Sequence, residues 1–306
     1  MGCRVMAVAV RHTGERSRTG RQRKPIIIPV GGAAHDRAVP AGRLRLRSAR
    51  IIVLLGLLIG AASAGETSVR RLENIERKML ALVNDARTER GLAPLKWNDK
   101  LAKAAGGHLV LMVEKKSLAH LLPGEEPLTR RIAATGLRFN ASAENVAFAT
   151  EWEDLHPGLM QSPGHRANIL SPKYNEVGIA VALGSNGYYA VQNFARTTSE
   201  WSTKEAELRL AAELRRRFGS GLEVMFSPAI RGAMCQMAGD DQVSAQRVPA
   251  ETPRRRTFAF TAAEPEDLPE KLTGSVNRSV KLVEVGVCYK ATPKYPGGTY
   301  WIGLAY

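Results

Sequence analysis

The segment Gln161–Leu170, QSPGHRANIL, carries the signals for the start of a helix. Ser162 is a favoured N-cap residue, whose hydroxyl is placed to accept a backbone N–H of the following turn. Pro163 suits the first helical position, where no N–H is needed. His165 would then lie in the first turn, beside the positive end of the helix dipole, which favours a neutral ring that serves as a ligand or hydrogen-bond partner. These signals predict a local structure but no function.

The positive charge of the chain is concentrated at its N-terminus. The 306 residues carry a net charge of +15, and residues 1–50 alone contribute +10, with twelve Lys and Arg against Glu15 and Asp36. The basic character therefore belongs to one tail and does not indicate a nucleic-acid-binding domain, so nucleic acid is not an expected partner. Residues 1–42 are rich in Arg, Gly and Pro, and we expect them to be a disordered leader.

Residues 43–64 have the parts of a secretory signal in their usual order. The basic stretch RLRLRSAR precedes the apolar run IIVLLGLLIGA, and the small residues of Ala62–Ala64 form an A-x-A cleavage site. The uncharged run 51–64 is short for a membrane span, which needs about 20 apolar residues. A cleaved signal, a retained signal-anchor and a buried helix of a cytosolic protein all remain open. The first two predict an exported protein, periplasmic or extracellular, that touches the membrane only if segment 51–64 is uncleaved.

Two cysteines remain when the leader is removed. Cys235 and Cys288 form an even pair, which in an exported chain favours a disulfide, and two separate buried thiols are the alternative.

Helices come first and a hairpin last in residues 66–198. Apolar residues recur at three- and four-residue steps in Val69–Arg90, and Asn98 or Asp99 can cap a second helix that ends near Lys116. Two β-branched and aromatic runs, Val177–Leu183 and Tyr188–Phe194, flank an Asn-Gly turn. This order predicts an α+β domain, arranged as a three-layer α-β-α sandwich.

Residues 200–306 read as a second, smaller α+β domain of unknown role. The pattern predicts a charged helix over 203–218 and strands over 257–262, 281–290 and 299–305. No internal repeat and no catalytic set of residues is evident in this part of the chain.

Three residues of the first domain carry chemistry that suits a site: His120, Glu144 and His165. Two imidazoles and a carboxylate suit either a Zn²⁺ ion with an open position or an acid/base pair. Their separation in the sequence does not itself place them together. His108 lies on the apolar face of the second helix and is interpreted as a core histidine with satisfied hydrogen bonds.

The first domain resembles the CAP superfamily (cysteine-rich secretory proteins, antigen 5 and pathogenesis-related 1), in its bacterial SCP-like form. The resemblance covers about residues 70–197 and depends on the order and spacing of several short motifs. These motifs are Leu82-Val83-Asn84 with Arg87, Leu95-Lys96-Trp97, Leu101 with Ala104-Ala105, His120, Glu144-Asn145, Ser162–Leu170 and Val177-Gly178.

The resemblance implies an α-β-α sandwich with a cleft in which two His and two acidic residues converge. By motif match His120, Glu144 and His165 are three of the four. The sequence departs from the family pattern at Ala143, where the family has Gly, and it has no clear second acidic residue. Glu153, Asp154 and His156 are the candidates for the fourth position.

Three functions follow from the resemblance as alternatives. The first is a non-enzymatic binding module for an apolar ligand, such as a lipid or sterol, or for a cell-wall or other envelope component. The second is a metal-assisted hydrolase, with Zn²⁺ on His120 and His165 and Glu144 as general base. The third is a structural or interaction protein, in which the His/Glu cluster only stabilises the fold.

Overall fold

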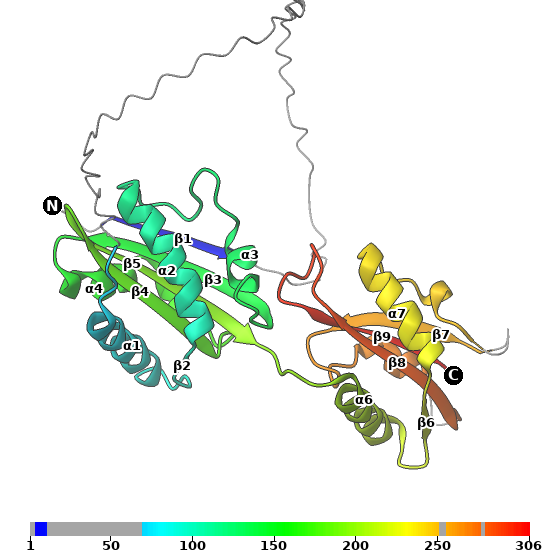
Figure 1. The fold of residues 1–306 in the computed structure, drawn as a ribbon. Helices are drawn as coiled ribbons and strands as arrows, with labels where there is room; N and C mark the ends of the chain where they lie inside the picture. The colour runs from blue at the N-terminus through cyan, green and yellow to red at the C-terminus, as the bar shows by residue number, and fades with distance from the viewer. Residues whose placement is uncertain (1–3, 11–68, 251–254, 277–278) are drawn as a thin grey trace, which may run out of the picture. The chain divides into compact units, whose positions relative to one another are not determined.

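The computed structural model describes residues 4–10, 69–250, 255–276 and 279–306, which form two sheet-containing regions (Figure 1). The predicted signal segment 43–64 lies outside these residues. Within the described residues no helix is both long and apolar enough to span a bilayer.

The first region is built on a five-stranded sheet in the order β1-β3-β5-β4-β2. The strands are β1 (Arg4–Val10), β2 (Lys96–Trp97), β3 (Phe139–Ala149), β4 (Glu176–Gly184) and β5 (Gly187–Thr197). Strand β2 runs parallel to β4, and the other neighbours are antiparallel. Strands β4 and β5 form the predicted hairpin, which closes at Gly184 and Gly187.

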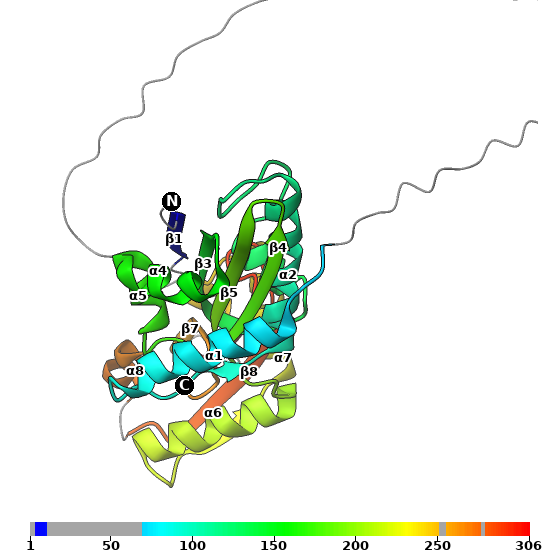
Figure 2. The same cartoon turned by 90° about the vertical axis from the view of Figure 1, so that its left-hand side faces the viewer.

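Helices cover both faces of this sheet (Figure 2). Helix α2 (Asp99–Glu114) packs on one face, and α3 (Leu128–Ala133) lies beside it. Helices α1 (Glu73–Thr88), α4 (Leu155–Gln161) and α5 (Pro163–Ile169) pack on the other face, where α4 follows the 3₁₀ turn η1 (Trp152–Asp154). Because side chains alternate along a strand, each face receives its own core. Met79 and Phe194 belong to the core under α1, and Leu109 and Val146 to the core under α2.

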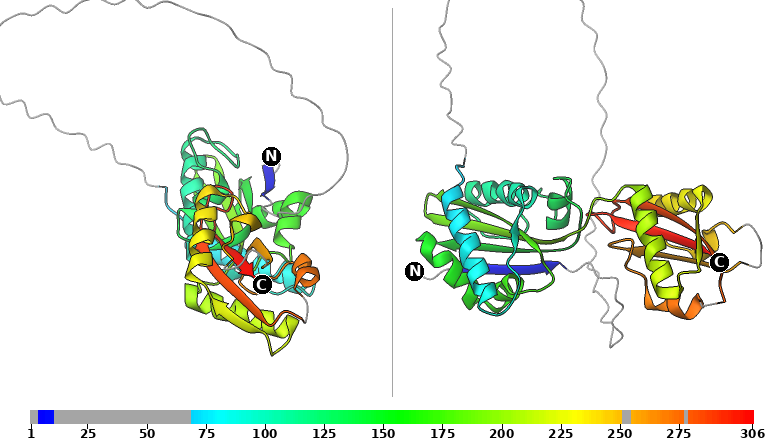
Figure 3. Two further views of the ribbon diagram at one scale, coloured as in Figure 1. Left: turned by 90° about the vertical axis from the view of Figure 1, so that its right-hand side faces the viewer. Right: turned by 90° about the horizontal axis from the view of Figure 1, so that it is seen from below.

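Two predictions for this region need correction. Ser162 is the N-cap residue of α5 and Pro163 follows it, but the Ser162 side chain makes no capping hydrogen bond. The backbone of Ser162 joins α4 directly to α5, because its N–H donates to Gly158 and its carbonyl accepts from Arg166. The structure also differs in the leader, where β1 pairs with the edge of β3 along its whole length (Figure 3). Apolar residues dominate that strand, a composition that favours pairing over disorder.

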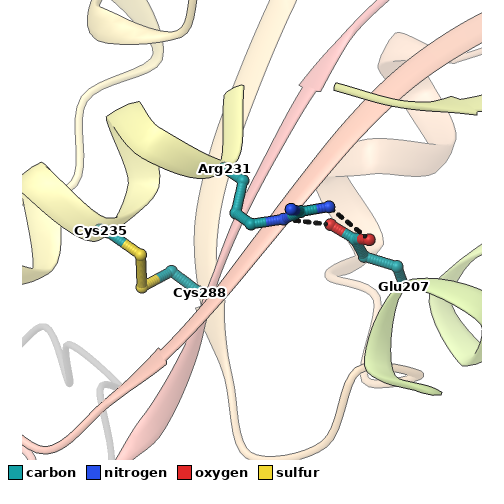
Figure 4. The surroundings of a disulfide bond; sticks show 4 residues. All are labelled: Glu207, Arg231, Cys235 and Cys288. Atoms are coloured by element: carbon teal, nitrogen blue, oxygen red, sulfur yellow. Dashed lines mark hydrogen bonds and ion pairs between the residues drawn. A yellow bond between two sulfur atoms is a disulfide. The ribbon is translucent and has the colours of Figure 1, made fainter. Parts of the chain in front are cut away.

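The second region holds a four-stranded sheet in the order β6-β8-β9-β7. The strands are β6 (Glu223–Phe226), β7 (Thr257–Ala262), β8 (Leu282–Lys290) and β9 (Thr299–Ala305). Helices α6 (Thr203–Phe218) and α8 (Glu270–Ser275) share a core with one face, and α7 (Pro228–Asp240), which precedes the 3₁₀ turn η2 (Ala245–Arg247), covers the other. A disulfide joins Cys235 of α7 to Cys288 of β8, as the sequence predicts (Figure 4). The α+β class predicted for both regions is confirmed.

Candidate binding site around His120 and Glu144

The carboxylate of Glu144 is the centre of a buried polar network. Its side chain is only 1% exposed, although it projects from the middle of β3. His120 Nδ1 lies 3.0 Å from Glu144 Oε1, and Arg131 Nη2 donates to Oε2 at 2.9 Å. In the amide orientation that satisfies its neighbours, Asn193 also donates to Oε2, at 3.1 Å. A buried carboxylate is costly unless it is paired and hydrogen-bonded, and here both oxygens are engaged.

A second carboxylate, that of Glu125, extends the network toward α2. Glu125 Oε1 lies 2.7 Å from His108 Nδ1 and 3.4 Å from Arg131 Nε. The other ring nitrogen of His108 lies 2.8 Å from the carbonyl of Ala119, which can only accept, so this nitrogen carries a hydrogen. Arg131 thus lies between the two buried carboxylates of Glu125 and Glu144 and pairs with both.

His120 is fixed in one orientation by this network. Arg131 Nη2 donates to the His120 carbonyl at 3.1 Å, and Glu144 accepts from the Nδ1 side of the ring. With the hydrogen on Nδ1, the opposite nitrogen Nε2 is an acceptor. Within the part of the chain that the structure describes, Nε2 is buried and has no hydrogen-bond partner, and the same is true of Arg131 Nη1. The side chain of His120 as a whole is 13% exposed, and the next residue, Leu121, is 54% exposed.

The neighbouring residue Asn145 holds α5 against the sheet. Its Nδ2 donates to Gln192 Oε1 at 3.0 Å and to the His165 carbonyl at 3.3 Å, and its Oδ1 accepts from Asn168 Nδ2 at 2.9 Å. Consecutive residues of a strand point to opposite faces, so Glu144 serves the α2 face and Asn145 the α5 face. Asn168 therefore braces α5 against β3.

The structure brings together two of the three predicted site residues. His120 and Glu144 are in contact, whereas His165 is buried on α5, which packs on the other face of the sheet from α2. The candidates for the fourth position lie apart from this pair. Glu153 and Asp154 are exposed on η1, and neither forms an ion pair with the network.

His156, the remaining candidate, lies in a different environment. It is buried on α4, where the loss of hydration lowers the pKa of its ring and the nearby charge of Asp85 on α1 opposes that shift. Its surroundings make it a core residue between two helices rather than a member of the network.

The residues that are present do not fit a Zn²⁺ site. Across residues 4–10, 69–250, 255–276 and 279–306, no three His, Cys, Asp or Glu side chains gather as metal ligands would. The Glu144 carboxylate, which the hydrolase alternative needs as a base, is already bound by Arg131 and His120. A general base has to be within reach of the proton that it removes, and both of these oxygens are occupied.

Sequence reasoning missed Glu125 and Arg131, and it found His108 without its partners. His108 is fully buried with both ring nitrogens bonded, which confirms its interpretation as a core histidine. A histidine on an apolar helix face needs polar partners from elsewhere in the chain. The acidic pair in the loop after His120, Glu125-Glu126, was the one available signal for such a partner.

Two further motif residues, Asn84 and Arg87, brace α1. Asn84 exchanges two hydrogen bonds with the backbone of Leu95, and Arg87 donates to the carbonyls of Ala93, Ile169 and Ser171. Both link α1 to the segments beside it. Burial lowers the pKa of Arg87.

Known proteins share this domain. Residues 80–194 match the model of the cysteine-rich secretory protein family, CAP. Two proteins of Bacillus subtilis (strain 168) are similar in sequence. "Uncharacterized membrane protein YlbC" is 27% identical over 147 residues, which are 47% of this chain and 41% of that protein. "Uncharacterized protein YkwD" is 30% identical over 105 residues, which are 34% of this chain and 41% of that protein. The chain thus spans about two fifths of the length of these relatives.

One similar solved structure is that of an extracellular protein containing a SCP domain from Bacillus anthracis. It is 25% identical, with a TM-score of 0.36, and the match covers 40% of this chain and 41% of that one. The family match spans the segments that carry Asn84, Arg87, His120, Glu144-Asn145 and His165. Residues 80–194 are therefore a domain of the CAP family of cysteine-rich secretory proteins.

Proposed function

We propose that this protein is exported and that its CAP domain is a non-enzymatic binding module for an apolar ligand or a component of the cell envelope. The observation that carries the proposal is the unpaired ring nitrogen of His120. Its ring is oriented by Glu144 and Arg131, and its Nε2 acceptor is buried without a partner in the described structure. An unmade hydrogen bond at a buried polar atom is costly, so such an atom favours a ligand that completes it.

The chemistry around His120 favours an amphiphilic ligand. A hydroxyl, amide or ammonium group can donate to Nε2, and an acceptor can receive a hydrogen from Arg131 Nη1. The exposed side chain of Leu121, beside His120 in the sequence, offers apolar contact to the rest of such a molecule. Lipids and sterol-like molecules combine these groups, as do lipid-linked cell-wall components.

Export is supported by the predicted signal over 43–64, by the disulfide, and by two similar proteins, one described as a membrane protein and one as extracellular. Both periplasmic and extracellular locations agree with these observations. An uncleaved segment 51–64 would anchor the protein to the membrane.

The test is co-sedimentation of the purified exported protein with vesicles of phosphatidylethanolamine, phosphatidylglycerol and cardiolipin, and with isolated peptidoglycan. Loss of the His120 acceptor should weaken binding about tenfold in His120→Ala, the equivalent of about 1.4 kcal/mol. The matched control is His156→Ala, which removes a buried histidine outside the network and should leave binding unchanged. Absence of binding to all of these preparations would contradict the proposal.

The structural alternative also has support, because Glu144, Arg131, Glu125 and His108 form a continuous set of buried ion pairs and hydrogen bonds. It predicts that His120→Ala lowers the free energy of unfolding and that no ligand binds. The hydrolase alternative has less support, given the engaged carboxylate. One Zn²⁺ per chain in metal analysis, lost in both His120→Ala and His165→Ala, would favour it.

A further inference from the structure

We propose that residues 203–305 are a second copy of the CAP-type fold, in which the polar site has been replaced by an apolar core. The first support is the topology. Apart from β1, the first sheet has the order β3-β5-β4-β2, and the second has the order β7-β9-β8-β6. In both, the short strand before the long helix is parallel to its neighbour, and all other neighbours are antiparallel.

The order of elements along the chain is the same in both units. Helix α1, strand β2 and helix α2 precede β3, β4 and β5, and α6, β6 and α7 precede β7, β8 and β9. Figure 1 shows α2 across the first sheet and α7 across the second. The units differ in their connections, since α3, α4 and α5 are replaced by the shorter segments that hold η2 and α8.

The two units also agree in register, residue by residue. The N-cap residue of α2, Asn98, donates its backbone N–H to Val177 at 2.9 Å, and that of α7, Ser227, donates to Val285 at 2.8 Å. Both side chains accept the N–H three residues later, from Leu101 and Ile230 respectively. The equivalence therefore aligns Asn98 with Ser227 and Val177 with Val285.

A glycine in each sheet marks the same close approach between helix and strand. Gly178 follows Val177, and a Cβ on it would lie 2.0 Å from the backbone nitrogen of Ala102. Gly286 follows Val285, and its Cβ would lie 2.2 Å from the backbone nitrogen of Arg231. Neither position has room for a side chain, so the same packing constraint selects glycine twice.

The buried faces of the helices match as well. Counted from the N-cap residue, the same four positions are buried in α2 and in α7. In α2 they hold Leu101, Ala105, His108 and Leu109, and in α7 they hold Ile230, Met234, Met237 and Ala238. Helices α1 and α6 also bury residues at the same spacing along the helix. In α1 they are Ile75, Glu76, Met79 and Val83, and in α6 they are Ala206, Glu207, Leu210 and Leu214. Each of these two helices includes a buried glutamate paired with an arginine, Glu76 with Arg71 and Glu207 with Arg231 (Figure 4).

The equivalence shows what the second unit has lost. In the first sheet, Gly178 pairs with Asn193, and Asn193 pairs with Glu144. In the second sheet, Gly286 pairs with Gly303, and Gly303 pairs with Ala259. Ala259 therefore stands in place of Glu144, Gly303 in place of Asn193, and Met237 in place of His108. The space above Gly303 is taken by Met234 and Ile230. Among the residues that the structure describes, the polar site accordingly occurs in the first unit and not in the second.

The disulfide of the second unit supplies a direct test. Cys235 and Cys288 are equivalent to Gly106 of α2 and Ala180 of β4. The full-length double variant Gly106→Cys with Ala180→Cys should form a new disulfide on air oxidation, while the native disulfide is retained. Gly106 accepts a side chain because its nearest neighbours are atoms of the Arg71 side chain at 3.4–3.7 Å. Peptide mapping of the non-reduced protein by mass spectrometry detects both cross-links.

The matched control is Gly107→Cys with Ala180→Cys, since Gly107 is exposed on the opposite side of α2 and should form no cross-link. Free thiols at positions 106 and 180 in a folded protein, or equal cross-linking of the control, would overturn the proposal. If the double variant does not fold, a crystal structure of the wild-type chain decides. Superposition of β7-β9-β8-β6 on β3-β5-β4-β2 with Gly286 on Gly178 supports the proposal, and a different strand order overturns it.

Discussion

Replacement of Arg131 by alanine tests whether the network around Glu144 is a buried set of compensated charges. Arg131 is 8% exposed and contacts both Glu144, which is 1% exposed, and Glu125. Its removal leaves two carboxylates without their shared cation. Loss of one partner of a buried pair costs about 3–5 kcal/mol, so Arg131→Ala should lower the free energy of unfolding by about that amount.

The neighbouring Arg130 is the matched control, because it is 55% exposed and pairs at 3.8 Å with the exposed Glu126. An exposed pair contributes at most about 1 kcal/mol, so Arg130→Ala should change stability little. Urea unfolding followed by circular dichroism measures both variants. In a double-mutant cycle, Glu144→Gln should recover about 1–3 kcal/mol of the Arg131→Ala loss, because it neutralises the stranded carboxylate. Equal stability of Arg130→Ala and Arg131→Ala would refute the reasoning.

Three further predictions concern packing, pH and the disulfide. Gly178→Ala should destabilise the protein by about 3 kcal/mol in thermal unfolding, because its Cβ would overlap the backbone of α2, whereas Gly107→Ala, with open space around it, should stabilise by about 0.5–1 kcal/mol. Burial lowers the pKa of His156 below its ordinary value of 6.5, so the unfolded chain binds a proton at this residue more readily than the folded chain. The free energy of unfolding of the wild type should therefore fall relative to that of His156→Gln as the pH drops through about 6.5. Parallel profiles of unfolding free energy against pH for the two proteins would contradict this. Joint replacement of Cys235 and Cys288 by serine should lower the free energy of unfolding by about 2–4 kcal/mol, and an unchanged denaturation midpoint would show that the bridge constrains nothing.

The elements with a clear period were predictable from the sequence. The stripe through Met79 and Val83, the cap at Asn98 and the Asn-Gly turn each produced the expected helix or hairpin. Strand β3 was not assigned, because it is buried on both faces and lacks the polar alternation that identifies a half-exposed strand. The prediction that the Ser162 side chain caps α5 is wrong, because α4 and α5 meet at that residue without a loop between them.

The candidate site was only half predictable. Motif order selected His120 and Glu144 correctly as a contacting pair, but contacts between distant segments do not follow from spacing. Arg131 and Glu125 belong to a short helix and a loop with no pattern of their own, and only the folded chain brings them to Glu144. The repeat in the second unit was hidden for a related reason. Topology and glycine positions are retained while the side chains of the polar site are replaced.

The tautomer of His120 tests the central claim, which is that the network holds this ring with Nε2 available to a ligand. Ring ¹⁵N chemical shifts, assigned by comparison with His120→Ala, report which nitrogen carries the hydrogen in the free protein at pH 7. The network predicts a hydrogen on Nδ1, donated to Glu144, and a bare Nε2 whose shift changes when an envelope lipid binds. A hydrogen on Nε2 with a bare Nδ1, or an Nε2 shift that no bound lipid alters, would contradict the account.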